Sequence, residues 1–270
     1  MHYTSIENIH KVIDPLFLDE LRAEFEDIKA AKQANVREKR LKEFQTKLSE
    51  LKFLDPACGS GNFLTETYIS LRKLENEILI EIYKGQMMFG DGDLNPIQVS
   101  IGQFYGIEIN DFAVTVAKTA LWIAESQMMK ETEEIVQMSL DFLPLKSYAN
   151  IVEGNALHVD WESVVPKDRL NYIMGNPPFV GARLMSAEQK DDVSFILNGA
   201  KGIGNIDYVS CWYKKAADMM KETEVRTALV STNSITQGEQ VAILWKNLFE
   251  NGVPVSYTHL RAHETLSDLV

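Results

Sequence analysis

The spacing of hydrophobic positions divides the chain near residue 50. Between residues 14 and 50 the chain is rich in charged residues, and apolar residues recur every three or four positions. The recurring positions are Leu18, Leu21, Phe25, Ile28, Leu41, Phe44 and Leu48. This spacing is typical of helices with one buried face, so we expect two helices or one long broken helix. We interpret residues 1–50 as a solvated helical lead-in that packs on the following domain.

Beyond Lys52, short apolar runs that end in turn residues alternate with helical stretches. Five strands are predicted within the strings LKFLD, QFYGIEIN, NIVEGNAL, LNYIMG and RTALVSTNS. Helices are predicted for residues 63–83 and for FAVTVAKTALWIAESQMM, DYVSCWYKKAADMMKE and GEQVAILWKNLFE, with a long loop between LNYIMG and DYVSCW. Such alternation indicates βαβ units. We therefore expect a doubly wound α/β fold with a mostly parallel, Rossmann-like sheet covered by helices on both faces.

Composition adds a cellular context and one objection. With 270 residues, of which 45% are hydrophobic, the chain can bury a sizeable core. Cys58 and Cys211 are too few for a disulfide framework, and no apolar run approaches the roughly 20 residues of a membrane span, so we expect a cytoplasmic protein without membrane contact. The net charge of −12 argues against general nucleic-acid binding, because phosphate contacts need clustered Lys and Arg.

A glycine-rich turn follows the first predicted strand and opens the next helix. Its residues are Asp55, Pro56, Ala57, Cys58, Gly59, Ser60, Gly61 and Asn62. Glycines let the backbone approach a ligand closely, and the carboxyl end of the first strand is where ligands bind in open α/β sheets. The turn is neither a P-loop nor a GxGxxG motif. By itself it is equally consistent with an ordinary tight turn.

The second predicted strand ends in Ile107-Glu108-Ile109. An acidic residue at this place can accept hydrogen bonds from both hydroxyl groups of a ribose. The separation between Asp55 and Glu108 is longer than the approximately 20 residues usual in dinucleotide folds, and we attribute the extra length to an insertion at residues 75–103. A plain surface carboxylate is the alternative interpretation of Glu108.

The fourth predicted strand runs into Asn176, Pro177, Pro178 and Phe179. Two prolines fix the backbone, and the Asn176 side-chain carbonyl and the Pro177 backbone carbonyl are acceptors suited to a planar NH2 group. Accepting both hydrogens of such an amine would localise its lone pair for attack on a methyl sulfonium. Phe179 offers a ring on which an extruded base can stack. The alternative is a proline turn, but the fourth strand should lie beside the first and bring Asn176 close to the Asp55 loop.

Other patterns are set aside. Residues 91–102 resemble the start of a calcium loop, but Pro96 and Gly102 occupy the positions of the required Gly and Glu. The five His residues have no metal-ligand spacing, so no metal site is expected. Gly199, Gly202 and Gly204 mark a loop that is either a lid or a flexible linker.

The motifs DPACGSGNF, GIEI, GNAL and GNPPF, in this order and spacing, resemble those of class I adenine-N6 DNA methyltransferases. The longer strings MGNPPFVGARLMS, GNIDYVSCWYKKA and VSTNSITQGEQVAILW are similar to the MmeI-type restriction–modification enzymes. The resemblance covers roughly residues 15 to 255. It implies a site-specific methyltransferase core that transfers a methyl group from S-adenosylmethionine to N6 of a flipped adenine in double-stranded DNA.

The resemblance also implies roles for individual residues. Ala57, Gly59 and Gly61, with their neighbours Pro56, Cys58 and Asn62, would line the methionine part of the cofactor, and Asp55 would hold its amino group. Glu108, followed by Ile109, would bind the ribose, and Asn155 with Ala156 would border the cofactor adenine. Many relatives have Asp at the position of Asn155, so the contact here would be that of an amide. Asn176, Pro177, Pro178 and Phe179 would hold the target base, and Tyr208 and Trp212 either wall the pocket or pack in the core.

The hydrophobic pattern changes again near Val255. The string SYTHLRAHETLSDLV resembles a translated sequencing adapter, so we expect residues 51–255 to form the methyltransferase domain, with its last strands incomplete, and residues 256–270 to be an artefactual tail. The family resemblance implies a parent protein with an endonuclease and a target-recognition domain. A recognition domain outside this chain would carry most DNA contacts, which answers the objection from the negative charge.

Two alternatives to the DNA methyltransferase remain at the level of sequence. An Asn-Pro-Pro-aromatic turn can also serve N-methylation of an RNA base or of a protein glutamine. The other alternative is a non-catalytic cofactor-binding or DNA-docking module within a larger assembly.

Overall fold

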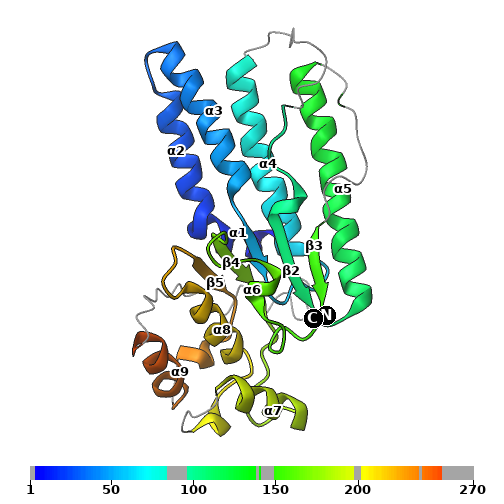
Figure 1. Cartoon of the computed structure of the whole chain (residues 1–270), viewed down its shortest axis with the longest axis vertical. Helices are drawn as coiled ribbons and strands as arrows, with labels where there is room; N and C mark the ends of the chain where they lie inside the picture. Colours follow the sequence, from blue (N-terminus) through cyan, green and yellow to red (C-terminus); the bar gives the residue numbers. More distant parts are fainter. Residues whose placement is uncertain are drawn as a thin grey trace.

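The computed structural model describes residues 4–83, 96–137, 140, 149–197, 202–236 and 239–250. A central sheet carries a tall group of helices on one side and a smaller group on the other (Figure 1). The expected last strands and the expected tail at residues 256–270 lie beyond residue 250, outside the described residues. Residues 91–95 of the string that resembles a calcium loop also lie outside them.

The sheet consists of five parallel strands in the order β3-β2-β1-β4-β5. The strands are β1 (Phe53–Asp55), β2 (Phe104–Glu108), β3 (Asn150–Glu153), β4 (Tyr172–Gly175) and β5 (Arg226–Leu229). The chain starts in the middle, moves to one edge and then returns past β1 to the other edge. This order confirms the doubly wound, parallel fold and places β4 beside β1, as the sequence predicts.

Strand residues alternate between two hydrophobic cores. Phe53 and Phe104 stack with ring centroids 5.2 Å apart in the core on the tall side. Leu54, Ile107 and Ile173 point into the core on the other side. Because successive strand residues face opposite sides, a sheet buried on both sides needs such nearly continuous apolar runs.

Nine α-helices accompany these strands in the described parts of the chain. The tall side holds α1 (Ile6–Ile13), α2 (Asp19–Lys29), α3 (Ala34–Glu50), α4 (Asn62–Tyr83) and α5 (Asp111–Val136), with a π-turn at Asp14–Leu18. The other side holds α6 (Trp161–Val164), α7 (Ala187–Ile196), α8 (Ser210–Met220) and α9 (Glu239–Glu250). Short 3-10 turns span Ile101–Gln103, Ile203–Asn205 and Asn233–Thr236.

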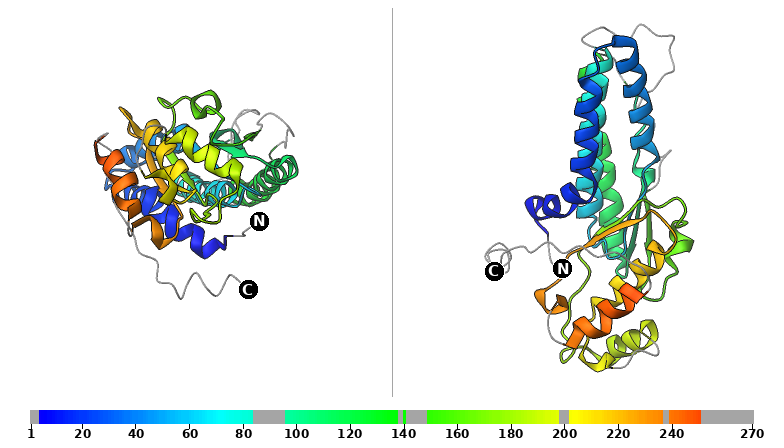
Figure 2. Two further views of the ribbon diagram at one scale, coloured as in Figure 1. Left: turned by 90° about the horizontal axis from the view of Figure 1, so that it is seen from below. Right: turned by 90° about the vertical axis from the view of Figure 1, so that its left-hand side faces the viewer.

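The helices α2 to α5 run side by side and extend well beyond the sheet (Figure 2). Their interior holds a buried pair, with Arg72 Nε 3.2 Å from Glu75 Oε2. Gln45 of α3 donates to the same carboxylate, as do the backbone amides of Gln98 and Val99. The lead-in helices therefore share their core with α4 and the sheet. The boundary that we predict at residue 50 stays a prediction.

Several local predictions differ from the structure. The lead-in forms two helices, α2 and α3, as one of the two options predicts, but a further helix, α1, precedes them. The prediction of one long loop before Asp207 is wrong, because α7 forms within it. The strand predicted within 226–234 ends at Leu229, where its pairing with β4 ends. Among the described helices, none combines the length and the apolar character that a transmembrane segment requires.

Candidate functional site at the carboxyl ends of the central strands

The loop after β1 is held in place by its glycines. Gly59 and Gly61 have φ angles of 54° and 83°, which residues with a Cβ atom rarely adopt. A Cβ at Gly61 would lie 2.9 Å from the Cβ of Ala117 on α5, so the loop packs tightly against that helix. A Cβ at Gly59 would meet no atom within 4 Å. The loop is thus fixed on one side and open on the other.

Glu108 connects this loop with the end of β2. Its Oε2 accepts a hydrogen bond from the Gly59 amide at 2.9 Å, and its Oε1 accepts one from the Asn110 amide at 3.0 Å. A carboxylate has about four acceptor sites, so two remain after these bonds. The structure brings together the two motifs that the sequence pairs, and the bond between them joins the Gly59 backbone amide to the Glu108 side chain.

Two exposed apolar side chains follow Glu108. Ile109 is 67% exposed, and Phe112 in the first turn of α5 is 72% exposed. Large apolar side chains at the rim of a ligand-binding edge can cover a flat ring. Phe112 is absent from the sequence-based candidates, since it falls on the regular pattern of the predicted helix.

Asp55 lies beneath the loop and is 1% exposed. Its Oδ1 accepts a hydrogen bond from the Ala57 amide at 3.0 Å. Burial raises the pKa of the Asp55 carboxyl to about 7, against the effect of the Ala57 hydrogen bond, and the negative charge of Glu108 raises it further. A buried carboxyl with no cation beside it favours the protonated form, and a positively charged ligand group would reverse that preference.

Asp55 also packs against the residue that precedes the proline turn. A Cβ at Gly175 would overlap the Asp55 carboxylate, whose Cγ lies 2.9 Å from that position. Gly175 is the last residue of β4 and connects directly to Asn176. The strand ends that lead into the glycine loop and the proline turn therefore lie so close that the position of Gly175 has no room for a side chain. Gly175 is absent from the sequence-based candidates.

Asn176 has one satisfied and one unsatisfied end. Its Nδ2 donates a hydrogen bond to Thr4 Oγ1 at 3.1 Å. Its Oδ1 is buried and has no hydrogen-bond partner among the residues that the structure describes. Most buried polar atoms in native structures are paired, so a buried acceptor without a partner is a candidate ligand-binding atom. Beside it, Pro177 is buried, while Pro178 is exposed and Phe179 is 39% exposed.

The loop after β3 is held by its neighbours. The Gly154 amide donates to the Glu108 carbonyl at 2.9 Å, which fixes this loop beside β2. Asn155 Oδ1 accepts from the Leu157 amide at 2.9 Å, and Trp161 Nε1 donates to the Ala156 carbonyl at 2.8 Å. The predicted cofactor residues Asn155 and Ala156 thus lie at the same edge as Glu108.

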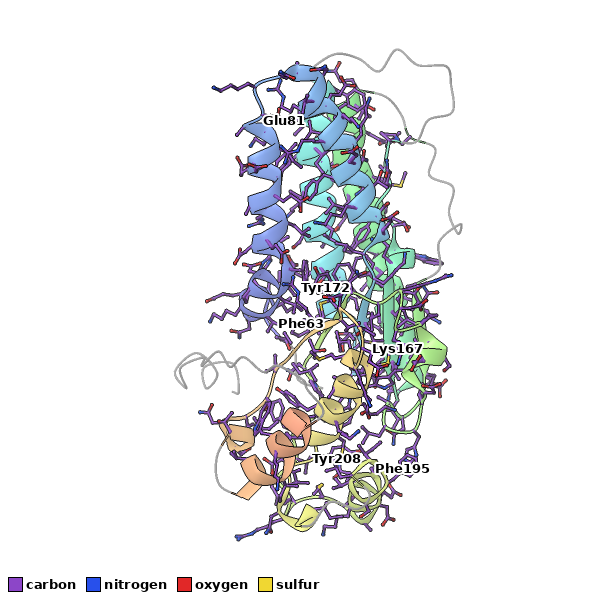
Figure 3. All side chains as sticks on the ribbon, turned by 60° about the vertical axis from the view of Figure 1, so that its left-hand side comes forward. Phe63, Glu81, Lys167, Tyr172, Phe195 and Tyr208 are labelled. Atoms are coloured by element: carbon purple, nitrogen blue, oxygen red, sulfur yellow. The ribbon has the colours of Figure 1, made fainter. Side chains whose placement is uncertain are left out.

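Tyr208 and Trp212 are buried, with 6% and 4% exposure, and their rings meet edge to face. Trp212 Nε1 donates to the Pro56 carbonyl at 3.1 Å, and Tyr208 donates to Asp192 at 2.5 Å. Both side chains pack in the core, and Trp212 in addition supports the glycine loop. Figure 3 shows Tyr208 and Phe195 on the side of α7 and α8, away from Tyr172 and Phe63.

Asp192 and Thr4 are also absent from the sequence-based candidates. Asp192 lies on α7, whose start is a capping box from Ser186 to Gln189. That box is a local signal for the helix, but not for the contacts of Asp192. Thr4 precedes α1 and carries no local pattern that points to Asn176. Within the described residues, no three His, Cys, Asp or Glu side chains come together as metal ligands.

Comparisons with known proteins show which family the chain belongs to. DNA methyltransferase A of Bacillus subtilis (strain 168) is 42% identical over 262 residues, which cover 96% of this chain and 29% of the relative. A putative type II restriction enzyme and methyltransferase of Methanocaldococcus jannaschii is 30% identical over 142 residues, which cover 50% of this chain and 10% of the relative.

Solved structures also match the chain. The Type IIL restriction-modification enzyme MmeI in complex with DNA matches with a TM-score of 0.84 and 40% identity over 97% of this chain and 35% of that one. The DrdV–DNA complex matches with a TM-score of 0.51 and 16% identity over 93% of this chain and 22% of that one, and it supports the fold alone. The chain spans about a third or less of the length of these relatives. The model of the MmeI DNA-methyltransferase domain matches residues 30–263, and the chain therefore belongs to the MmeI DNA-methyltransferase domain family.

Proposed function

We propose that this chain carries the catalytic centre for methyl transfer from S-adenosylmethionine to N6 of an adenine flipped out of double-stranded DNA. The observation that carries the proposal is the Asn176 side chain at the end of β4, whose buried Oδ1 meets no hydrogen-bond donor in the described part of the chain. That atom is an acceptor beside the Asp55 loop, where a donor group would complete its hydrogen bonding.

The residues present fit the cofactor. The open side of Gly59 leaves space along the loop, and Glu108 keeps acceptor sites for two ribose hydroxyl groups. Burial and the charge of Glu108 disfavour the ionised form of the Asp55 carboxyl, and the amino group of the methionine part would supply a positive charge that favours it. Asn155 and Ala156 would border the adenine, with Ile109 and Phe112 as apolar cover. When bound, S-adenosylmethionine supplies an electrophilic methyl group on a sulfonium.

The proline turn accounts for the acceptor chemistry. The amino group of adenine is a weak nucleophile because its lone pair is delocalised into the ring. Asn176 Oδ1 and the Pro177 carbonyl would accept its two hydrogens and localise the lone pair on nitrogen. Phe179, partly exposed at the end of the turn, would stack on the extruded base. These contacts become favourable as positive charge develops on the nitrogen.

The parent protein supplies the context for DNA. With a net charge of −12, this chain offers little general attraction to phosphates. We therefore assign base reading to a recognition domain outside the chain, in a restriction–modification protein of the cytoplasm that also carries an endonuclease. The relatives named as restriction enzymes, or solved with DNA, support this assignment.

Methyl transfer from labelled S-adenosylmethionine tests the proposal. Duplex DNA, RNA and protein are compared as methyl acceptors. Each is tested with the chain alone and with a joined protein, in which the chain replaces the matched segment of DNA methyltransferase A. We expect label on N6 of adenine in DNA from the joined protein. Label on an RNA base or a glutamine would replace the proposed acceptor, and absence of S-adenosylmethionine binding by both proteins would favour a non-catalytic module.

A further inference from the structure

One face of α8 reaches both loops that carry the proposed cofactor-binding residues. Tyr208, Trp212 and Lys215 are spaced four and three positions apart, from the turn before α8 into the helix. Side chains at this spacing lie on one face of a helix. Each of the three bonds to a different part of the molecule.

Trp212 supports the loop after β1. Its ring nitrogen donates to the Pro56 carbonyl at 3.1 Å, and the side chain is 4% exposed. The carbonyl belongs to the residue that follows Asp55 in the chain. A buried hydrogen bond between a rigid ring and this carbonyl restricts the position of the loop.

Lys215 supports the loop after β3. Its Nζ donates to the Val159 carbonyl at 2.6 Å and to the Leu157 carbonyl at 3.3 Å, and it lies 5.4 Å from the centre of the Trp161 ring. Two carbonyls that point at one ammonium group fix the course of the chain between them. Such charge-assisted bonds are roughly twice as strong as neutral ones.

Tyr208 reaches the same loop through Asp192. The Asp192 carboxylate accepts from the Tyr208 hydroxyl at 2.5 Å and from Asn155 Nδ2 at 3.4 Å. Its other oxygen is 2.6 Å from His158 Nε2, and the His158 ring stacks on Phe195 of α7. A single buried carboxylate thus connects α7, the start of α8 and the loop after β3.

We infer that Tyr208, Trp212, Lys215 and Asp192 are positioning residues that hold the two cofactor loops in their binding conformation. We call this set the α8 clamp. The inference rests on the proposed function, and it deepens that function by placing control of cofactor affinity on a helix behind the loops. If the loops adopt the binding conformation for only a fraction of the time, the apparent affinity for the cofactor is reduced to that fraction of its intrinsic value.

Conservative variants of the clamp test the inference against matched controls on the same side of the sheet. Lys215→Met is compared with Lys214→Met, since Lys214 pairs with Asp218 within α8. Tyr208→Phe is compared with Tyr213→Phe, since Tyr213 donates to the Leu229 carbonyl of β5. Trp212→Phe is compared with Trp245→Phe, since Trp245 donates to the Ile235 carbonyl. None of the control residues contacts either cofactor loop through these bonds.

Calorimetry of S-adenosylmethionine binding and thermal unfolding give the first readouts. We expect each clamp variant to bind about 2- to 12-fold more weakly, the range of a lost net hydrogen bond, and each control to bind as tightly as the parent. In the joined protein, KM for the cofactor rises in clamp variants while kcat is retained. Equal weakening in clamp and control variants that tracks the drop in Tm, or unchanged binding in the clamp variants, would overturn the inference.

Asp192→Asn and Tyr208→Phe form a double-mutant cycle. The two changes should be non-additive for cofactor binding, because they remove the same connection. Additive effects would contradict the inference that Asp192 and Tyr208 act through one shared contact.

Hydrogen exchange separates this inference from the proposed function. If the parent chain binds no S-adenosylmethionine, the proposed function fails. The clamp still predicts faster amide exchange at residues 155–159 in Lys215→Met than in Lys214→Met. Equal exchange rates in the two variants would overturn the clamp whatever the cofactor result.

Discussion

The cofactor loops and the proline turn lie side by side at one edge of the sheet, but they differ in how their polar groups are paired. On the cofactor side, Asp55 and Glu108 accept hydrogen bonds from loop amides, and Asn155 pairs with a neighbouring amide. On the side of the proline turn, Asn176 Oδ1 is buried and has no partner within the described residues. An unpaired buried polar atom costs about 1–3 kcal/mol. The difference shows that the chain pairs the polar groups of the first half itself, and under the proposed function a substrate would pair the acceptor of the second half.

Replacing the unpaired acceptor has the largest expected effect. Asn176→Ala should abolish methyl transfer, because the Pro177 carbonyl alone accepts one hydrogen of the amine and the side-chain acceptor for the other is lost. The variant should leave S-adenosylmethionine binding nearly intact. Transfer is measured with labelled cofactor in the joined protein, and binding by calorimetry. Loss of both together would show that the two halves are not separate.

Asp55→Asn should weaken cofactor binding and change how stability depends on pH. The pKa of Asp55 lies at about 7 in the folded chain, above its ordinary value, chiefly because of burial. Between about pH 4 and pH 7 the folded state keeps a proton that the unfolded chain has released, so the free energy of unfolding falls as pH rises through this window. The variant should lack this decline, which amounts to about 4 kcal/mol by pH 8.

Urea unfolding of the parent and of Asp55→Asn between pH 5 and pH 8 measures the difference. Taking the difference removes contributions from the other titratable groups of the chain. A difference that does not change with pH would contradict the raised pKa.

The contact between the two halves can be broken at Gly175. Gly175→Ala places a Cβ against the Asp55 carboxylate, and we expect a loss of about 1–3 kcal/mol in the free energy of unfolding, with weaker cofactor binding. Gly204→Ala is the control, since a Cβ there meets no atom within 4 Å. Similar losses in the two variants would mean that the close approach of β1 and β4 at Gly175 contributes neither to stability nor to cofactor binding.

Glu108→Gln should have the smallest effect. The amide keeps one acceptor for the Gly59 or Asn110 amide but loses the charge and the second acceptor. We expect S-adenosylmethionine binding to weaken about tenfold and binding of a 2′-deoxyribose analogue to weaken less, since each lost charge-assisted bond is worth roughly 1.5–3 kcal/mol. Equal weakening for both ligands would argue against a ribose contact.

Much of the sheet and of the site was predictable. The alternation of short apolar runs and helical stretches predicts five strands, and each motif falls at the carboxyl end of its strand. The fold then brings Gly59 to Glu108 and Asp55 to the residue before Asn176. Helix α7 was predictable from its capping box but was interpreted as a loop. Residues such as Thr4 and Asp192 carry no pattern that ties them to partners 172 and 37 positions away.

The sequence by itself determined the succession of the five strands and the residues at their ends, because periodicity and turn chemistry are local properties, and its motifs indicated the family. Only the tertiary structure decided which of those residues are paired. Burial raises the pKa of Asp55, the overlap with Gly175 places the two motifs in contact, and α8 reaches both cofactor loops. These properties depend on neighbours that are distant in the chain. A local sequence pattern does not show which residues are shielded from solvent or which donor meets which acceptor.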